Sequence, residues 1–433
     1  MSNTQIVQSN GIYHGLPVYP SSLKGLTAII TGANGISGYY MLRVLAQDPE
    51  RWTKIYCLSR RPPVLPDGLP KNAEHIALDF LKQPEEIASV LKEKGVKADY
   101  IFFYSYLQTT PKAQSGPKPA AGLSSDAEEM CRVNVALLRN FCEALPLASI
   151  KPKRILLQTG AKNYGVHLGP TATPSEEDQP RVTLEPNFYY AQEDYLWSFC
   201  ASHSISWNVC MPSGILGAVP DAAMNMVLPL GIYASVQKHL NKPLEFPCDL
   251  ASWDTSLCLS TSTLNAHMEQ WAVLTPPAAN HRFNTVDSSP FTWGNFWPKY
   301  AAWYRSPYKP PVLDDAAYTS ISSRFDTQPR GFGPPAQYRF RFRLADWARD
   351  PAVQRAWEEL VAAHSLSAAT LQDMDIDRIF GFMDGCLLGG SVNLTMNKAR
   401  KLGWHGFVDS CDAFKEVLEE FALIKMLPPV GRE

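Results

Sequence analysis

The stretch that decides the fold is LTAIITGANGISG, residues Leu26–Gly38. A short apolar run rich in β-branched residues leads into three glycines, Gly32, Gly35 and Gly38, and a helical pattern follows. Glycine lets the backbone turn tightly, so that an anion can approach the free N–H groups at the start of the helix. No Gly-Lys-Ser/Thr follows, which excludes the phosphate loop of nucleoside triphosphatases. The stretch therefore predicts a strand–turn–helix unit that binds the pyrophosphate of a dinucleotide.

Strand and helix patterns alternate outward from this unit. This order is typical of an α/β fold, a Rossmann-type doubly wound parallel sheet with right-handed crossovers. The predicted strands are Leu26–Thr31, Lys54–Ser59, His75–Leu78, Tyr100–Ser105, Arg154–Thr159 and Trp207–Met211. The predicted helices between them are Glu85–Lys94, Ala127–Glu143 and Tyr190–Ala201.

The alternation ends after about residue 216, where helical patterns are joined by proline-rich loops. We therefore predict an N-terminal extension over residues 1–23, a dinucleotide-binding Rossmann domain over 24–220 and a mainly helical substrate-binding lobe over 221–433. The extension is polar and is expected to lie across the surface. The helices predicted for the lobe are Met224–His239, Asp346–Ala363, Ile376–Leu388 and Asp409–Leu423.

Composition limits the partners of the chain. Forty Lys and Arg against 42 Asp and Glu give a net charge of −2 over 433 residues, which disfavours nucleic acid and anionic membranes as partners. No apolar run is long enough to span a membrane, and the N-terminus does not resemble a secretory signal. Nine cysteines without a CxxC pair indicate reduced thiols rather than structural zinc, so we expect a cytoplasmic protein without a metal site. No pattern in the chain predicts an oligomeric state.

The end of the second strand indicates which dinucleotide is bound. An acidic residue there would accept from a ribose 2′-hydroxyl, but this chain has Arg60-Arg61. Guanidinium groups match a phosphate, so NADP(H) is favoured over NAD(H), although a solvated basic turn would leave the same pattern. Asp79, after the third strand, is placed to accept from the adenine amino group.

The Tyr-x-x-x-Lys pair of ordinary short-chain dehydrogenases is absent. Taken alone, this absence would suggest a regulator that binds the dinucleotide without turnover. Two other segments change that interpretation: LQTGAKNY, Leu157–Tyr164, follows a predicted strand, and NFYYAQED, Asn187–Asp194, opens a predicted helix.

With these two segments, the chain resembles the progesterone 5β-reductase/iridoid synthase-like (PRISE) family of atypical short-chain dehydrogenases. Arg60–Pro62 matches the family's RRP, and Ala222–Asn225 approximates its SMMN segment. The resemblance implies an extended Rossmann fold, with Lys162 and Tyr189 as the catalytic pair. It also implies cofactor contacts at Gly32, Asn34, Gly35, Ile36, Gly38, Ser59, Arg60, Arg61, Asp79, Phe80, Ser105, Thr159, Gly160, Lys162, Tyr189, Pro212, Gly214 and Ile215.

The chemistry of the family can be followed from these residues. Hydride adds to the β-carbon of an enone, a phenol stabilises the enolate oxygen, and an ammonium group lowers the pKa of the phenol. We expect a small hydrophobic carbonyl substrate from natural-product metabolism, held by Tyr106, Tyr164 and Met224. The segment Pro111–Ser125 is either a solvated loop or a lid over the site.

Several positions depart from the family pattern, among them Asn163 in place of His and Met211 in place of Arg. These departures surround the substrate rather than the phosphates, so three other functions stay open. The same site would serve a ketone reductase that works by 1,2-addition, or an enzyme whose reduced product goes on to cyclise. A dinucleotide-sensing binding protein without turnover is the third.

Overall fold

The fold is centred on a parallel sheet. Residues 6–109, 126–221 and 224–431 are described by the computed structural model, and within them seven strands follow the order β12-β8-β7-β6-β3-β4-β5. The predicted Rossmann-type doubly wound sheet is confirmed. The strands are β3 (Leu26–Thr31), β4 (Trp52–Ser59), β5 (Ala73–Ala77), β6 (Tyr100–Phe103), β7 (Arg154–Gln158), β8 (Ser206–Pro212) and β12 (His281–Thr285).

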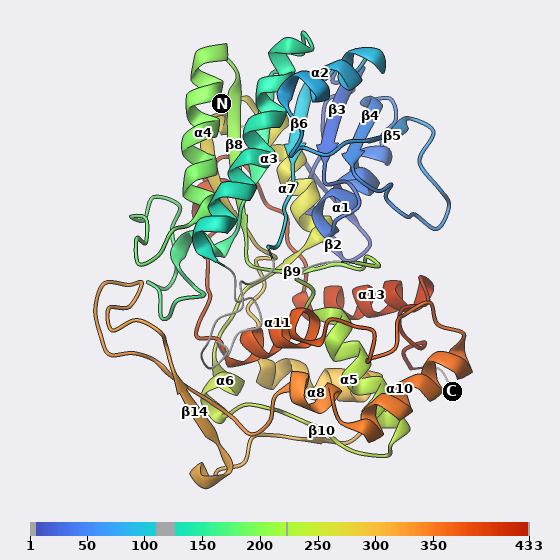
Figure 1. Cartoon of the computed structure of the whole chain (residues 1–433), viewed down its shortest axis with the longest axis vertical. Coiled ribbons are helices and arrows are strands. Elements are labelled where there is room, and N and C mark those ends of the chain that lie inside the picture. Colours follow the sequence, from blue (N-terminus) through green and yellow to red (C-terminus); the bar gives the residue numbers. More distant parts are fainter. Residues whose placement is uncertain (1–5, 110–125, 222–223, 432–433) are drawn as a thin grey trace.

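Helices cover both faces of this sheet (Figure 1). One face carries α1 (Ile36–Ala46) and α7 (Ser262–Leu274), and the other carries α2 (Pro84–Glu93), α3 (Ala127–Leu147) and α4 (Phe188–His203). The central strands are buried on both faces, which explains why they appear in the sequence as short continuous apolar runs. The strand order reverses between β3 and β6, and ligands of such sheets bind at that reversal.

The edge strand β12 of the sheet comes from the second half of the chain. The sequence analysis assigned that half to the helical lobe. Both α7 and β12 lie beyond residue 220, so the sheet and the lobe interleave along the chain rather than meeting at that residue. Strand β12 has no apolar run, and internal hydrogen bonds accommodate some of its polar side chains. For example, Asn284 Nδ2 donates to Ser175 O at 3.1 Å and to Thr395 O at 3.0 Å.

The helical lobe lies below the sheet in Figure 1, with β9 (Gly214–Leu216) between the two. Strand β9 pairs in parallel with β11 (Leu259–Thr261). The other lobe helices are α5 (Val227–His239), α6 (Leu250–Asp254), α8 (Trp293–Trp303), α9 (Leu344–Ala348), α10 (Pro351–His364), α11 (Ile376–Leu388), α12 (Asn397–Lys401) and α13 (Ser410–Leu423). Two strand pairs, β10 (Leu244–Glu245) with β13 (Tyr308–Lys309) and β14 (Thr319–Ser322) with β15 (Gln337–Phe340), complete the lobe.

Two lobe helices differ from their predicted bounds because of local caps. The predicted helix Asp346–Ala363 is two helices, since Pro351 starts α10 and Asp350 accepts from Ala352 N at 2.7 Å as its N-cap. Helix α5 starts at Val227 rather than Met224, because Asn225 Oδ1 accepts from Val227 N at 2.9 Å.

The N-terminal extension forms a hairpin instead of simply lying across the surface. Strands β1 (Val7–Asn10) and β2 (Tyr13–Pro17) pair in antiparallel fashion, and the Tyr13 and Leu16 side chains are buried. The Tyr13 hydroxyl bonds to Glu416 on α13, so the start of the described chain is held to the lobe.

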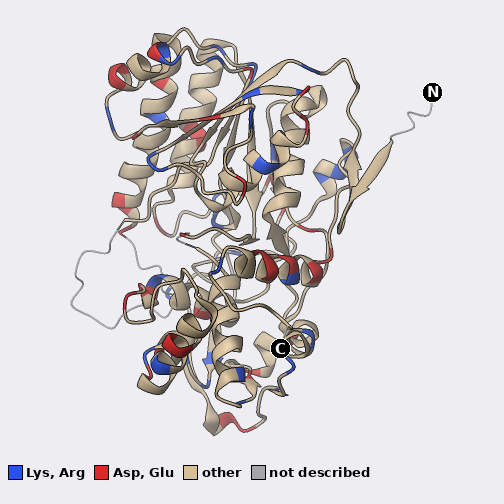
Figure 2. Ribbon diagram, turned by 90° about the vertical axis from the view of Figure 1, so that its right-hand side faces the viewer, with Lys and Arg blue, Asp and Glu red and all other residues tan. Residues whose placement is uncertain are grey.

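Charged residues of both signs are interspersed over both halves of the molecule (Figure 2). Among the described residues, no helix combines the length and the apolar character that crossing a membrane requires. All nine cysteines are described and are free thiols. The segment Pro111–Ser125, predicted to be either a solvated loop or a lid, lies outside the described residues.

Candidate active site

The glycine loop after β3 brings the start of α1 to the carboxyl end of the sheet. Gly32 has a φ of +63°, and a Cβ on Gly38 would lie 2.5 Å from Gly32 O. Gly35 is the N-cap of α1 and provides no side-chain cap, so the first N–H groups of the helix are left for an anion. The loop therefore fits a pyrophosphate on its backbone.

Hydrogen bonds tie this loop to the ends of two neighbouring strands. Thr31 Oγ1 accepts from Tyr104 N at 3.1 Å and from Ser105 N at 3.2 Å, which holds the end of β6 beside the loop. Gln158 Nε2, at the end of β7, donates to Ser37 Oγ in the first turn of α1 at 2.8 Å. The predicted cofactor residues Asn34, Ile36 and Ser105 thus lie along one edge.

The arginine pair follows β4 directly. Buried Ser59 donates from Oγ to Arg61 O at 2.7 Å and so shapes the turn, while Arg60 and Arg61 are exposed. Arg61 also forms an ion pair with Asp221, with 3.0 Å between Arg61 Nη2 and Asp221 Oδ2. Guanidinium groups are therefore available at the edge where a 2′-phosphate is expected.

The residues after β5 divide between solvent and core. Asp79 is partly exposed and accepts from Leu81 N at 2.9 Å. The Phe80 ring lies in the core, 5.1 Å from the ring of Phe141, so only its backbone is left for a cofactor contact.

The hydroxyl of Tyr189 lies beside the ends of β7 and β8. An ideal Cβ on Gly160 would be 3.3 Å from Tyr189 Oη and 3.4 Å from Pro212 O. Because Gly160 has no side chain, the Tyr189 hydroxyl can lie this close to the backbone after β7. Tyr189 is 9% exposed, and burial raises the pKa of its phenol.

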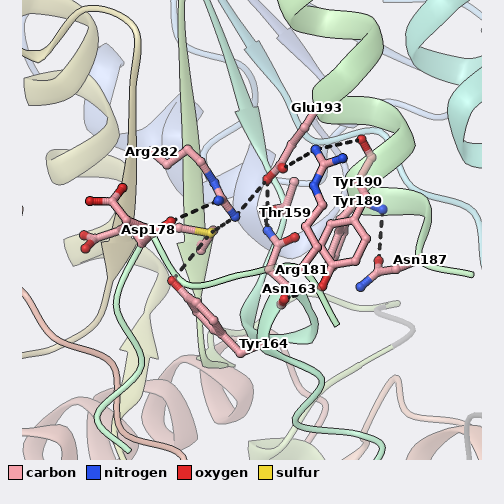
Figure 3. A network of polar contacts seen from close by, with 12 residues as sticks. Thr159, Asn163, Tyr164, Asp178, Arg181, Asn187, Tyr189, Tyr190, Glu193 and Arg282 are labelled. Atoms are coloured by element: carbon pink, nitrogen blue, oxygen red, sulfur yellow. Dashed lines mark hydrogen bonds and ion pairs between the residues drawn. The ribbon is translucent and has the colours of Figure 1, made fainter. Parts of the chain in front are cut away.

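Lys162 comes from a short 3₁₀ helix, Ala161–Tyr164, which directly follows the end of β7. Asn187 links it to the helix of Tyr189. Its Nδ2 donates to Lys162 O at 2.9 Å, and its Oδ1 accepts from Tyr189 N at 3.1 Å (Figure 3). Burial lowers the pKa of the Lys162 ammonium group, and the carboxylate of Glu185 opposes that shift. The two predicted catalytic residues are thus positioned by one side chain.

A buried carboxylate, that of Glu193, bonds to residues around the Lys162 loop and α4 (Figure 3). Glu193 on α4 is fully buried and accepts from Asn163 Nδ2 at 3.1 Å; it also pairs with Arg181 at 3.2 Å and with Arg282 at 3.4 Å. Asn163 donates in addition to Thr159 Oγ1 at 2.9 Å. The contacts of Glu193 therefore connect α4 with the loop of Lys162 and with strand β12.

Aromatic side chains form an apolar wall on one side of Tyr189. Phe188 lies 4.3 Å from the Tyr189 ring and 5.8 Å from the Tyr106 ring, centroid to centroid, and Met130 joins the cluster. Tyr106, one of the predicted substrate residues, therefore lies in the apolar cluster beside Tyr189.

Two other predicted substrate residues are placed differently. Tyr164 is buried, and its hydroxyl donates to Asn284 Oδ1 on β12 at 2.6 Å, so the structure does not group it with Tyr106. Met224 is half-buried between β9 and α5. Pro212, Gly214 and Ile215 continue from the end of β8 into β9.

The sequence analysis did not assign roles to Asn187, Glu193, Arg181 or Arg282. Asn187 has the residue type of an N-cap directly before a helical pattern, which is a signal that sequence alone provides. The arginines pair with Glu193 only through the tertiary fold, and no spacing in the chain indicates that contact.

A family model described as the PRISE-like Rossmann-fold domain matches residues 28–311 of this chain. Relatives align over nearly the whole length. A short chain dehydrogenase, gsfE, of Penicillium aethiopicum is 28% identical and covers 93% of this chain and 99% of its own. An (S)-8-oxocitronellyl enol synthase of Catharanthus roseus is 26% identical (93% and 92%), and a 3-oxo-Δ(4,5)-steroid 5β-reductase of Arabidopsis thaliana is 26% identical (94% and 95%).

Among solved structures, a UDP-glucose 4-epimerase of Thermotoga maritima superposes with a TM-score of 0.56. It is 12% identical and covers 92% of this chain and 99% of its own. At that identity the similarity concerns the fold alone.

Proposed function

The chain belongs to the PRISE-like Rossmann-fold family, and from this premise we propose that it is an NADPH-dependent reductase of a small hydrophobic enone. Family membership makes it an oxidoreductase of the extended short-chain dehydrogenase type. The observation that carries the finer proposal is the position of the Tyr189 hydroxyl beside Gly160 and Pro212, with Lys162 tied to the same helix start through Asn187.

The dinucleotide would be held by two groups of residues. The backbone of the glycine loop and the start of α1 suit its pyrophosphate, and Arg60 and Arg61 suit a 2′-phosphate, which favours NADPH over NADH. When bound and reduced, the dinucleotide supplies the hydride that adds to the β-carbon of the substrate.

Tyr189 would act on the oxygen of the same substrate. As the β-carbon gains hydrogen, negative charge develops on the carbonyl oxygen, and the phenol donates a hydrogen bond to it. Burial raises the pKa of Tyr189, so the phenol stays protonated and remains a donor at neutral pH. Lys162 supplies a positive charge that favours the developing anion, and the α-carbon then takes a proton from water.

The surroundings of Tyr189 support an apolar substrate. Phe188, Tyr106 and Met130 offer ring and thioether surface next to the donor. Two relatives carry compound classes in their names, an oxo-steroid that is reduced and an oxocitronellyl enol that is formed, and both compounds are small and largely hydrocarbon. We infer that this chain acts on a molecule of similar character.

The test is reduction of 2-cyclohexen-1-one and of a 3-oxo-Δ4 steroid with NADPH deuterated at C4, followed by location of the deuterium by NMR. We expect it at the β-carbon. Deuterium at the carbinol carbon would identify a 1,2-reductase that uses the same site. If the protein binds NADPH tightly but oxidises none of it with any enone or ketone, the result would favour the non-catalytic sensor and overturn the proposal.

A further inference from the structure

An ion-pair triad joins the sheet to the helical lobe near the nucleotide edge. Arg61 Nη2 lies 3.0 Å from Asp221 Oδ2, and Arg378 Nη2 lies 2.8 Å from Asp221 Oδ1. Arg61 follows β4, Asp221 follows β9, and Arg378 is in the first turn of α11. Three segments far apart in the sequence thus meet at one carboxylate.

The position of the triad connects it with the dinucleotide site. The segment that leads to Asp221 runs along the start of α1: a Cβ on Gly217 would lie 2.8 Å from Ile36 Cγ1, and Val219 clusters with Tyr39 and Tyr40. A recess at the same place is lined by Val219, Asp221, Arg378 and Ile379. Arg378 therefore reaches the nucleotide edge although it belongs to the lobe.

The two guanidinium groups hold one oxyanion between them, each through a different oxygen. Arginine binds phosphate and carboxylate oxygens with the same planar donors, so a phosphate group can replace the carboxylate between the two side chains. We propose that Arg378 is an additional ligand of the 2′-phosphate of NADPH, and that Asp221 stands where this phosphate binds. The inference rests on the proposed cofactor.

The charges at this edge agree with the assignment. Arg60, Arg61 and Arg378 carry three positive charges and Asp221 one negative charge, so two positive charges remain for a 2′-phosphate that carries up to two negative ones. The side chain of Arg378 is 33% exposed, whereas that of Arg61 is 69% exposed. Arg378 therefore loses less conformational entropy than Arg61 when it binds an anion.

The experiment compares adenosine 2′,5′-bisphosphate with adenosine 5′-monophosphate by titration calorimetry on the full chain. The two probes differ by the 2′-phosphate alone. We expect Arg378→Ala to weaken the bisphosphate about tenfold, in line with one charge-assisted contact, and to leave the monophosphate within about twofold. Unchanged binding of the monophosphate also shows that the variant is folded.

Two further variants sharpen the test. Arg349→Ala is the matched control, because Arg349 pairs with Asp377, the neighbour of Arg378, at 2.8 Å and should not affect either probe. Asp221→Asn removes the competing carboxylate and should tighten the bisphosphate a few-fold. Unchanged or weaker bisphosphate binding in Asp221→Asn would overturn the placement of the phosphate.

Failure of this inference can be told apart from failure of the proposed function. If Arg61→Ala weakens the bisphosphate while Arg378→Ala does not, Arg378 is no ligand and the NADPH proposal stands. If Arg60→Ala, Arg61→Ala and Arg378→Ala all leave the preference for the bisphosphate unchanged, both proposals fall.

Discussion

The glycine loop and the proposed catalytic pair, Lys162 and Tyr189, lie at the same edge of the sheet, but they are built in opposite ways. The loop is one continuous segment, Gly32–Gly38, that offers backbone N–H groups, and side chains are kept out by contacts such as Gly38 against Gly32 O. Lys162 and Tyr189 come from two segments and offer side chains, and the amide of Asn187 links the backbones of the two segments. The comparison teaches that the proposed dinucleotide site depends on local backbone, whereas the proposed catalytic site depends on tertiary contacts.

The largest expected effect separates the two regions directly. Tyr189→Phe removes the donor without changing the ring, so turnover should fall about 10²–10³-fold while the dissociation constant of NADPH changes less than about threefold. Stopped-flow reduction and fluorescence titration measure the two quantities. The matched control is Tyr195→Phe on the same helix, whose hydroxyl contacts only Arg139 O at 3.4 Å among the bonds described, and which should retain turnover. Equal turnover in both variants would remove Tyr189 from the chemistry.

The opposite result is expected in the loop. In Gly38→Ala the new methyl group would lie 2.5 Å from Gly32 O and 2.8 Å from Ala33 Cα, so the loop must shift and NADPH affinity should fall about 100-fold. Turnover at saturating NADPH should change much less. Gly390→Ala, where no atom lies within 4 Å of the new Cβ, is the control. A loss of turnover at saturation as large as the loss of affinity would break the division between the two regions.

A pH effect should belong to the scaffold under the loop. Glu269 on α7 bonds to the hydroxyl of Tyr104, whose backbone adjoins Gly32, and burial raises the pKa of Glu269 to about 8. Because the folded state holds this proton and the unfolded state releases it near pH 4.5, stability falls as the pH rises towards 8. We expect a loss of about 2 kcal/mol between pH 6 and 7.5.

Urea unfolding of the wild type and of Glu269→Gln at both pH values measures this loss. The variant should lack it, because an amide does not titrate. Asp287 and Asp384, whose pKa values burial raises to about 6, act mainly below this window and remain in both proteins. A parallel decline in wild type and variant would assign the proton to another group.

The smallest effect concerns the link between the two segments that carry the proposed catalytic residues. Asn187→Ser keeps an N-cap acceptor for α4 but is too short to donate to Lys162 O, so turnover should fall about tenfold with little change in stability. Asn187→Ala also loses the cap and should cost about 1 kcal/mol of stability in addition. Both turnover and the pH profile of kcat are to be measured. Full turnover in Asn187→Ser would mean that the amide only caps the helix.

Much of the nucleotide region could be predicted because its signals are local. The apolar run of β3, the spaced glycines and Arg60-Arg61 follow each other in the chain, and the sheet they predict is present. Strand β12 could not be predicted in the same way. Its buried Asn284 is satisfied by Ser175 and Thr395, which are distant in sequence, and the apolar pattern of a buried strand is missing.

By itself, the sequence determined the strand–glycine–helix unit, the alternating order of the elements before residue 216 and the residue types of the catalytic motifs. Each of these depends on backbone conformation and residue spacing, which neighbours in the chain control. Only the tertiary structure decided that Asn187 bonds to Lys162, that Glu193 lies between two arginines and that Arg378 meets Arg61 at Asp221. Such contacts arise when packing brings distant segments together, and no local preference of the chain encodes them.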